Sequence, residues 1–122
     1  MSSSFAHLHV HSHYSLMRGV DSLESLAQAA RERGMDRFAL TDTNALYGFV
    51  FYRQICAETG LLPIGGGEIA EREISEGCIA VPPRSPRRAV LLARGREGYA
   101  SLCRVVTARH LGPEFEIARA QR

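Results

Sequence analysis

Four of the chain's five histidines stand at every second position between residues 7 and 13, within the stretch HLHVHSHYS. Side chains at alternate positions of a strand share one face, with neighbours about 6.6 Å apart along the chain. Two adjacent imidazoles of this row could therefore bind one metal ion, because His is the commonest metal ligand. A row of solvated surface histidines would have the same pattern, so the row alone leaves both interpretations open. The pattern argues against a purification tag, since tag histidines are consecutive whereas these alternate with other residues.

Polar side chains follow two further apolar segments. LTDTN supplies Thr41, Asp42, Thr43 and Asn44, and GGGEI supplies Glu68. Asp42 alone could cap a helix, and Glu68 alone could lie at a solvated strand end. Together with the histidines, however, these carboxylates favour a site for zinc, manganese or iron, ions that can activate water to cleave phosphate esters.

The elements that must position these residues alternate between strand and helix, which favours right-handed βαβ units and a parallel α/β sheet. In such sheets ligands gather at the C-terminal ends of the strands. Asp21 or Ser22 can cap the first helix, and an apolar run suits the last strand for a buried position. Predicted strands cover residues 5–11, 35–42, 61–70 and 87–94, predicted helices cover 20–34, 45–60 and 96–113, and a hairpin or excursion covers 72–86.

Composition limits the class of protein. The 122 residues are 45% apolar and 23% charged, as expected for one small soluble domain or part of a larger one. The net charge of +2 is too small for a surface that coats nucleic acid. Cys56, Cys78 and Cys103 are far apart, so neither a zinc ribbon nor a disulfide framework is indicated, and Cys56 and Cys103 are predicted core thiols. Without a membrane span or signal peptide in the sequence, we expect a cytoplasmic protein.

Three segments resemble the opening motifs of the polymerase and histidinol phosphatase (PHP) domain. They are HLHVHSHYSLMRG, ALTDTNALYG and GLLPIGGGEI, in this order and spacing. The extra histidine and the following YSL are most similar to the N-terminal PHP domains of bacterial DNA polymerase III alpha subunits and error-prone DNA polymerases. A later segment, AVLLARGREGYASLCRVVTARHLG, also resembles these polymerases rather than stand-alone PHP phosphatases. The resemblance covers about residues 5 to 112.

This resemblance implies a distorted barrel of about seven βα units, of which the chain supplies the first three or four. We therefore expect residues 1–122 to form a partial PHP domain, with its motifs in 5–70, a strand and helix in 87–112 and a frayed tail in 113–122. A truncated product or a fragment of a polymerase is the leading explanation for this length.

The resemblance also implies a set of metal ligands, namely His9, His11, Asp42 and Glu68. Two positions depart from the family pattern, because Arg18 replaces the usual acid before the glycine and Thr43 replaces the usual histidine after the acid. A guanidinium repels a metal ion but can bind a phosphate or pair with Glu68. The candidate phosphate-binding or site-lining residues are His7, Arg18, Thr43 and Asn44, and His13 is expected to be a solvated loop residue. A divalent ion (zinc, manganese or magnesium) is implied, but the two departures indicate a degenerate site, so that retention of a metal and its loss both remain open.

Three functions remain open. The first is a structural PHP region of a polymerase for DNA replication or damage-tolerant synthesis, inactive alone. Its partners would be DNA, bound through the missing polymerase domains, other polymerase subunits and the remaining PHP segment, with no membrane. The second is a small metal-dependent phosphoesterase that completes its site by oligomerising. The third is a non-catalytic interaction module whose exposed sheet edge recruits another chain.

Overall fold

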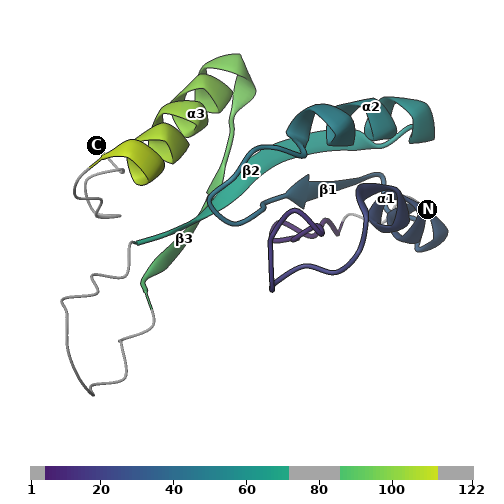
Figure 1. The fold of residues 1–122 in the computed structure, drawn as a ribbon. Helices are drawn as coiled ribbons and strands as arrows, with labels where there is room; N and C mark the ends of the chain where they lie inside the picture. Colours follow the sequence, from purple (N-terminus) through teal and green to yellow (C-terminus); the bar gives the residue numbers. More distant parts are fainter. Residues whose placement is uncertain (1–4, 72–85, 113–122) are drawn as a thin grey trace.

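The computed structural model describes residues 5–71 and 86–112 and confirms the predicted α/β class. The predicted tail, and all but the last residue of the predicted excursion at 72–86, lie outside the described residues. No described helix is long and apolar enough to cross a membrane. The elements follow in the order α1 (Leu23–Glu32), β1 (Arg37–Leu40), α2 (Phe49–Thr59), β2 (Leu62–Ala70), β3 (Arg88–Leu92) and α3 (Gly95–Leu111) (Figure 1).

The long strand β2 is the centre of the sheet, whose described order is β1-β2-β3. Its first half pairs in parallel with β1, from Arg37 opposite Leu62 to Leu40 opposite Gly65. Its second half pairs with β3 in the antiparallel sense, with Gly66 opposite Leu92 and Ala70 opposite Arg88. The two partners therefore lie at opposite ends of β2, as Figure 1 shows.

The last strand corrects two sequence predictions. It is antiparallel, whereas strand and helix alternation predicted a parallel sheet. A parallel connection needs a crossover, usually a helix, and glycine and prolines such as those in the sequence of 72–86 disfavour a regular helix. It is also not buried. Exposed and half-buried residues alternate along β3, because it is the edge strand of the described sheet.

The predicted strand at 5–11 is reduced to one parallel bridge, between Val10 and Leu40. The segment still runs beside β1, since Ala39 N–H donates to the His7 carbonyl over 2.7 Å and Thr41 N–H to the Val10 carbonyl over 2.9 Å. The Thr41 hydroxyl also accepts from Val10 N–H at 2.9 Å. The segment thus carries the histidines alongside β1 without being a regular strand.

The two helices α1 and α2 pack together and cover the β1 end of the sheet. Ser22 caps α1, its hydroxyl accepting from Ser25 N–H, and Gly60 ends α2 in the left-handed conformation. The Tyr52 hydroxyl, in the middle of α2, donates to the Phe38 carbonyl of β1. The buried core that these elements share consists of Leu23, Ala27, Ala30, Phe38, Leu40, Tyr52, Cys56 and Leu61.

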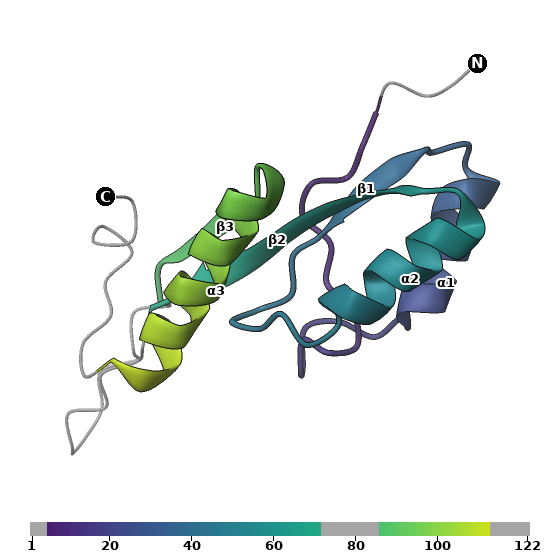
Figure 2. The same cartoon turned by 90° about the horizontal axis from the view of Figure 1, so that it is seen from above.

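The last helix, α3, covers the second half of β2, and Figure 2 shows its ribbon on the other part of the sheet from α1 and α2. Leu102 is its buried residue, whereas Cys103 is only partly buried and Cys56 fully buried. The Phe49 and Tyr99 rings stack with centroids 4.9 Å apart and join α2 to α3. The group formed by α1, α2 and β1 and the group formed by β3 and α3 therefore both pack against β2, the strand that contains Glu68.

Candidate metal centre

Glu68 brings two of the histidines together. Its side chain is 2% exposed, and its Oε2 atom lies 2.7 Å from His9 Nε2 and 3.4 Å from His11 Nε2. The imidazoles are 51% and 15% exposed and meet edge to face, with centroids 4.9 Å apart. The three ligand atoms all lie within 4.8 Å of one another. Among the described residues, this is the one group of three or more His, Cys, Asp or Glu side chains that could hold a metal ion.

The other oxygen of Glu68 faces cations and a hydroxyl. Arg88 Nη1 donates to Oε1 over 2.9 Å, and Thr43 Oγ1 donates to it over 3.1 Å. Arg18 Nε lies 3.6 Å from the same oxygen. The carboxylate therefore has two sides, with imidazoles on Oε2 and guanidinium groups on Oε1.

The charges around Glu68 keep it ionised although it is buried. Burial raises the pKa of Glu68, but the hydrogen bonds from His9 and Arg88 and the charges of His11 and Arg18 lower it by more, so its pKa lies below 4.5. Burial is also the main cause that lowers the pKa of His11, and the charges of His9 and Arg18 act in the same direction. An imidazole that stays neutral is the form that binds metals.

The donor set fits one divalent ion. His11 Nε2 is buried and makes no hydrogen bond within the described residues, as expected of an atom whose partner is a ligand. Two histidines and one glutamate are ligands that zinc accepts, at about 2.0–2.2 Å each. Such an ion would compete with Arg18 and Arg88 for Glu68, because its positive charge would be repelled by the two guanidinium groups.

Asp42 lies outside this group and binds the loop that follows the histidines. Its Oδ1 atom accepts from Ser12 N–H and from the Ser15 hydroxyl, each over 2.7 Å, and its Oδ2 atom accepts from the Ser12 hydroxyl over 2.8 Å. All three side chains are buried. Ser15 also accepts from Thr43 N–H at 2.9 Å, so the carboxylate fixes the loop against the end of β1. Its geometry is that of a positioning residue.

His7, His13 and Asn44 are not among the three candidate metal ligands. His7 packs edge to face on Phe5 with centroids 4.8 Å apart, and His13 lies on the ring of Tyr14 at 4.4 Å. His13 is exposed, as predicted. Asn44 adopts a φ of 52° and connects two elements, because its N–H donates to the Glu68 carbonyl and its Oδ1 accepts from Ala70 N–H, each over 2.8 Å.

Arg88 is the site residue that sequence reasoning missed. On the antiparallel ladder Ala70 is opposite Arg88 and Glu68 is opposite Val90, so Arg88 and Glu68 are diagonal neighbours on one face. The signal was the arginine at the start of the last predicted strand. It could not be read without the antiparallel register, which a parallel prediction excludes.

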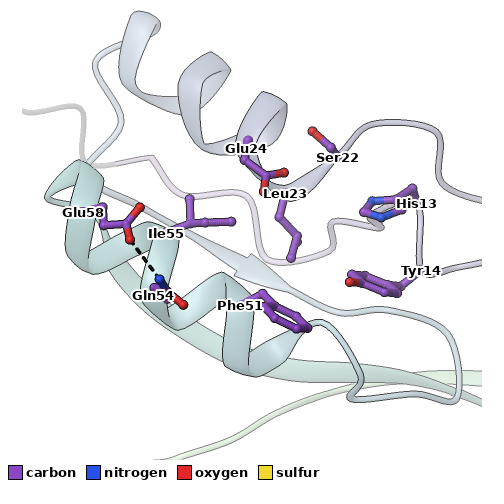
Figure 3. Close-up of a pocket in the computed structure, with 9 residues that line it drawn as sticks. All are labelled: His13, Tyr14, Ser22, Leu23, Glu24, Phe51, Gln54, Ile55 and Glu58. Carbon is purple, nitrogen blue, oxygen red and sulfur yellow. Dashed lines mark hydrogen bonds between the residues drawn. The ribbon is translucent and has the colours of Figure 1, made fainter.

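A separate groove of about 430 Å³ lies between α1 and α2 (Figure 3). Tyr14 and Phe51 lie at one end of it, and Gln54 donates to Glu58 over 3.1 Å on the α2 side. None of the three metal-binding candidates lines this groove. His13 is its one histidine, and the groove lacks the convergent ligands that surround Glu68.

Comparisons with known proteins agree on the family of this arrangement. The PHP domain family matches residues 7–122. An error-prone DNA polymerase of Symbiobacterium thermophilum is 40% identical over 111 residues, which is 91% of this chain. A DNA polymerase III subunit alpha of Treponema pallidum is 35% identical over 104 residues, or 81% of the chain. The chain spans 9% of the length of each of these polymerases.

Solved structures with the same fold come from other proteins. One is assigned as a metal-dependent phosphoesterase of Bifidobacterium adolescentis, with a TM-score of 0.56 and 19% identity over 86% of this chain and 34% of that one. Another is an amidohydrolase of Chromobacterium violaceum with bound sulfate and no metal, with a TM-score of 0.56 and 23% identity over 88% of this chain and 37% of that one. At these identities the likeness concerns the fold.

Proposed function

This chain belongs to the PHP domain family, and from that membership we propose that it is the N-terminal PHP segment of a bacterial DNA polymerase of the error-prone or III alpha type. Its own role in that polymerase is structural. The polymerase would carry out DNA replication or damage-tolerant synthesis in the cytoplasm, with DNA contacted by other domains. The other subunits and the rest of the PHP fold are the partners that this proposal implies.

One observation supports the structural role, namely that both oxygens of the buried Glu68 carboxylate have hydrogen-bond partners. Its carboxylate is hydrogen-bonded to His9 of the N-terminal segment, to Thr43 after β1 and to Arg88 of β3. Three segments distant in sequence thus meet at one buried charge. A buried carboxylate with several charge-assisted hydrogen bonds fixes its partners in one arrangement, and breaking such a cluster is costly.

Metal binding at this site is limited, in our proposal, to one ion. When bound, the ion would be held by His9, His11 and Glu68 and would polarise a water or phosphate oxygen. Arg18 and Thr43 stand where the family pattern has an acid and a histidine, so further ligands are missing. Arg18 instead contributes positive charge near Glu68.

The test is metal content measured on the purified chain. After equilibration with zinc or manganese and removal of the free ion, we expect at most one ion per chain, and His11→Ala should remove it. Arg18→Glu combined with Thr43→His restores both family residues, so it should raise the stoichiometry or the affinity. Two or more tightly bound ions in the unaltered chain, with hydrolysis of a generic phosphodiester, would reject a structural role.

The phosphoesterase alternative is favoured by one specific feature, the buried His11 Nε2 atom that lacks a hydrogen bond within the described residues. The same assay tests it. Hydrolysis that His9→Ala and His11→Ala both abolish would establish this activity, whereas activity indifferent to both substitutions would come from a contaminant.

A further inference from the structure

We propose that a groove between α2 and α3 binds an acidic segment of a partner protein, in which a large apolar side chain stands between carboxylates. The groove has a volume of about 970 Å³, and none of the three metal-binding candidates lines it. It therefore lies apart from the site around Glu68, and this docking surface goes beyond the proposed function.

Two stacked aromatic rings give the groove a fixed apolar surface. Phe49 of α2 and Tyr99 of α3 both line it, with ring centroids 4.9 Å apart and planes 24° apart. Gly65 lets the Phe49 ring lie directly on the backbone of β2, because a Cβ atom at this position would be 2.6 Å from Phe49 Cε2. Val50, which is 69% exposed, adds apolar surface beside the rings. An apolar surface that is already ordered costs little further entropy when a partner binds.

Each helix places one arginine next to this ring pair. Arg53 follows Phe49 by four residues on α2, and Arg96 precedes Tyr99 by three on α3, so each arginine shares a helix face with one ring. Both arginines line the groove. Burial is the main cause that raises the pKa of Tyr99, and the charge of Arg53 acts in the opposite direction, as expected of a cation near the Tyr99 hydroxyl. The groove thus combines an apolar centre with two cations from different helices.

The charges of these two arginines are not compensated within the described residues. Arg53 and Arg96 are exposed and make no hydrogen bond or ion pair there, whereas Arg37, Arg87 and Arg88 each pair with a carboxylate. No acidic residue lines the groove. A guanidinium binds a carboxylate through its planar fork, so carboxylates of a partner are the groups that would complete this surface.

An acidic protein segment suits the groove better than a strand of nucleic acid. A nucleic-acid strand carries one negative charge per nucleotide and is bound along a track of cations. The groove instead presents two arginines among mainly apolar lining residues, and the net charge of the whole chain is only +2. A segment with glutamates on both sides of leucine and phenylalanine matches both the charge and the apolar centre.

The experiment titrates the full 122-residue chain into a fluorescein-labelled peptide of sequence EELFEE, followed by fluorescence anisotropy at low ionic strength. We expect saturable binding that added salt weakens, because exposed charges are screened over about 10 Å at about 0.1 M salt. The peptide QQLFQQ lacks the carboxylates and EEGSEE lacks the apolar centre, so each should bind at least about tenfold more weakly. Equal binding of QQLFQQ would overturn the inference, because the arginines would then have no part in recognition.

Variants assign the binding to the groove. Arg53→Gln and Arg96→Gln should each weaken EELFEE binding about three- to tenfold, since each removes one partner of a carboxylate. Val50→Asp places a negative charge at an exposed position of the groove and should weaken binding at least as much. Arg94→Gln is the matched control, because Arg94 is exposed and does not line the groove, and it should change the affinity less than about twofold.

Two further arms test other occupants. A fluorescein-labelled oligothymidylate that binds as tightly as EELFEE, and loses affinity in the same variants, would make the groove a nucleic-acid site and overturn the inference. Sedimentation velocity tests a second copy of the chain. A dimer that Arg53→Gln and Arg96→Gln both dissociate would identify the second copy as the occupant and would also overturn it.

Folding is controlled separately by circular dichroism of each variant. The side chains of Arg53, Arg96 and Val50 are exposed, so we expect all three variants to retain their helices. Absence of EELFEE binding to the folded, unaltered chain would reject the docking surface, and so would unchanged binding in folded Arg53→Gln and Arg96→Gln. Neither result would affect the structural role of Glu68, because that role is measured by metal content and by unfolding without peptide.

Discussion

Arg88 Nη1 lies 2.9 Å from Glu68 Oε1, reaching it diagonally across the antiparallel pair of β2 and β3. The contact joins an edge strand to the buried centre of the sheet, and its carboxylate also holds His9 of the N-terminal segment. A single carboxylate therefore connects β3 with the part of the chain that carries the histidines. The fold of this PHP segment and its candidate site depend on the same residue.

Removal of Arg88 should destabilise the chain. Arg88→Ala takes away one of the hydrogen bonds that lower the pKa of buried Glu68 and leaves the carboxylate less well compensated. Because Arg88 is about one third exposed, solvent offsets part of the loss, and we expect a decrease of about 1–2 kcal/mol in the free energy of unfolding. Urea unfolding followed by circular dichroism measures it.

Arg37→Ala is the matched control for this prediction, because Arg37 pairs with a surface carboxylate, Asp36, over 2.8 Å. Exposed pairs of this kind contribute little, so the loss in unfolding free energy should be clearly smaller than that of Arg88→Ala. Equal losses in the two variants would show that the Arg88 contact has no special weight.

Asp42 should act through the loop rather than through metal. Asp42→Asn replaces an acceptor of three hydrogen bonds with a neutral amide, and we expect a loss of about 1–3 kcal/mol in unfolding free energy. Ser15→Ala removes one of those donors and should cost less. Metal stoichiometry should be unchanged in folded Asp42→Asn, while a loss matching that of His11→Ala would identify Asp42 as a ligand.

Gly19 should tolerate no side chain. A Cβ atom there would lie 2.0 Å from the Ser12 carbonyl oxygen, so the loop that carries Arg18 would have to move. We expect Gly19→Ala to cost about 2 kcal/mol or more in unfolding free energy. Gly34→Ala is the comparison, since Gly34 has a φ of 72° and open space around it, and only the left-handed conformation is penalised, by about 1 kcal/mol. A smaller loss for Gly19→Ala than for Gly34→Ala would contradict the packing of this loop.

Stability should fall at alkaline pH. Burial raises the pKa of Cys56 above 9.0 and that of Tyr52 above 10.0. A group whose pKa is raised by folding contributes stability below its unfolded pKa and loses it as pH rises toward the folded value. Unfolding free energies should therefore decline from about pH 9 upward.

Cys56→Ala tests this pH dependence. The variant loses packing at every pH, but its decline between about pH 8 and about pH 10 should be shallower than that of the unaltered chain. Cys103→Ala, at a partly buried thiol, should keep the steeper slope. Parallel slopes in all three proteins would refute the contribution of the Cys56 thiol.

The sequence predicted the helices well because their signals are local. Ser22 as a cap, the spacing of Leu23, Ala27 and Ala30, and the glycine at 60 all act within a few residues. The direction of β3 is not encoded locally, because it depends on the strand with which β3 pairs. The apolar run at 87–94 indicates that a strand forms, but it does not indicate that this strand lies at the edge of the described sheet.

For the candidate site, as for the fold, the sequence predicted some features and not others. His9, His11 and Glu68 were found because their types and spacing follow a family pattern, and the structure brings them within 4.8 Å. Arg18 was expected to pair with Glu68, and it lies 3.6 Å away. The three hydrogen bonds that turn Asp42 toward the loop depend on tertiary packing, which residue spacing does not reveal.

The most direct test of the structural role of Glu68 is the free energy of unfolding measured with and without a chelator, for the unaltered chain and for Glu68→Gln. We predict that the chelated, unaltered chain keeps its stability and that Glu68→Gln loses about 2–4 kcal/mol in either condition, because the arginines and histidines then lack their shared carboxylate. If chelation lowered the stability of the unaltered chain as much as Glu68→Gln does, a bound metal ion would hold the site together, which would contradict the structural role of the Glu68 carboxylate.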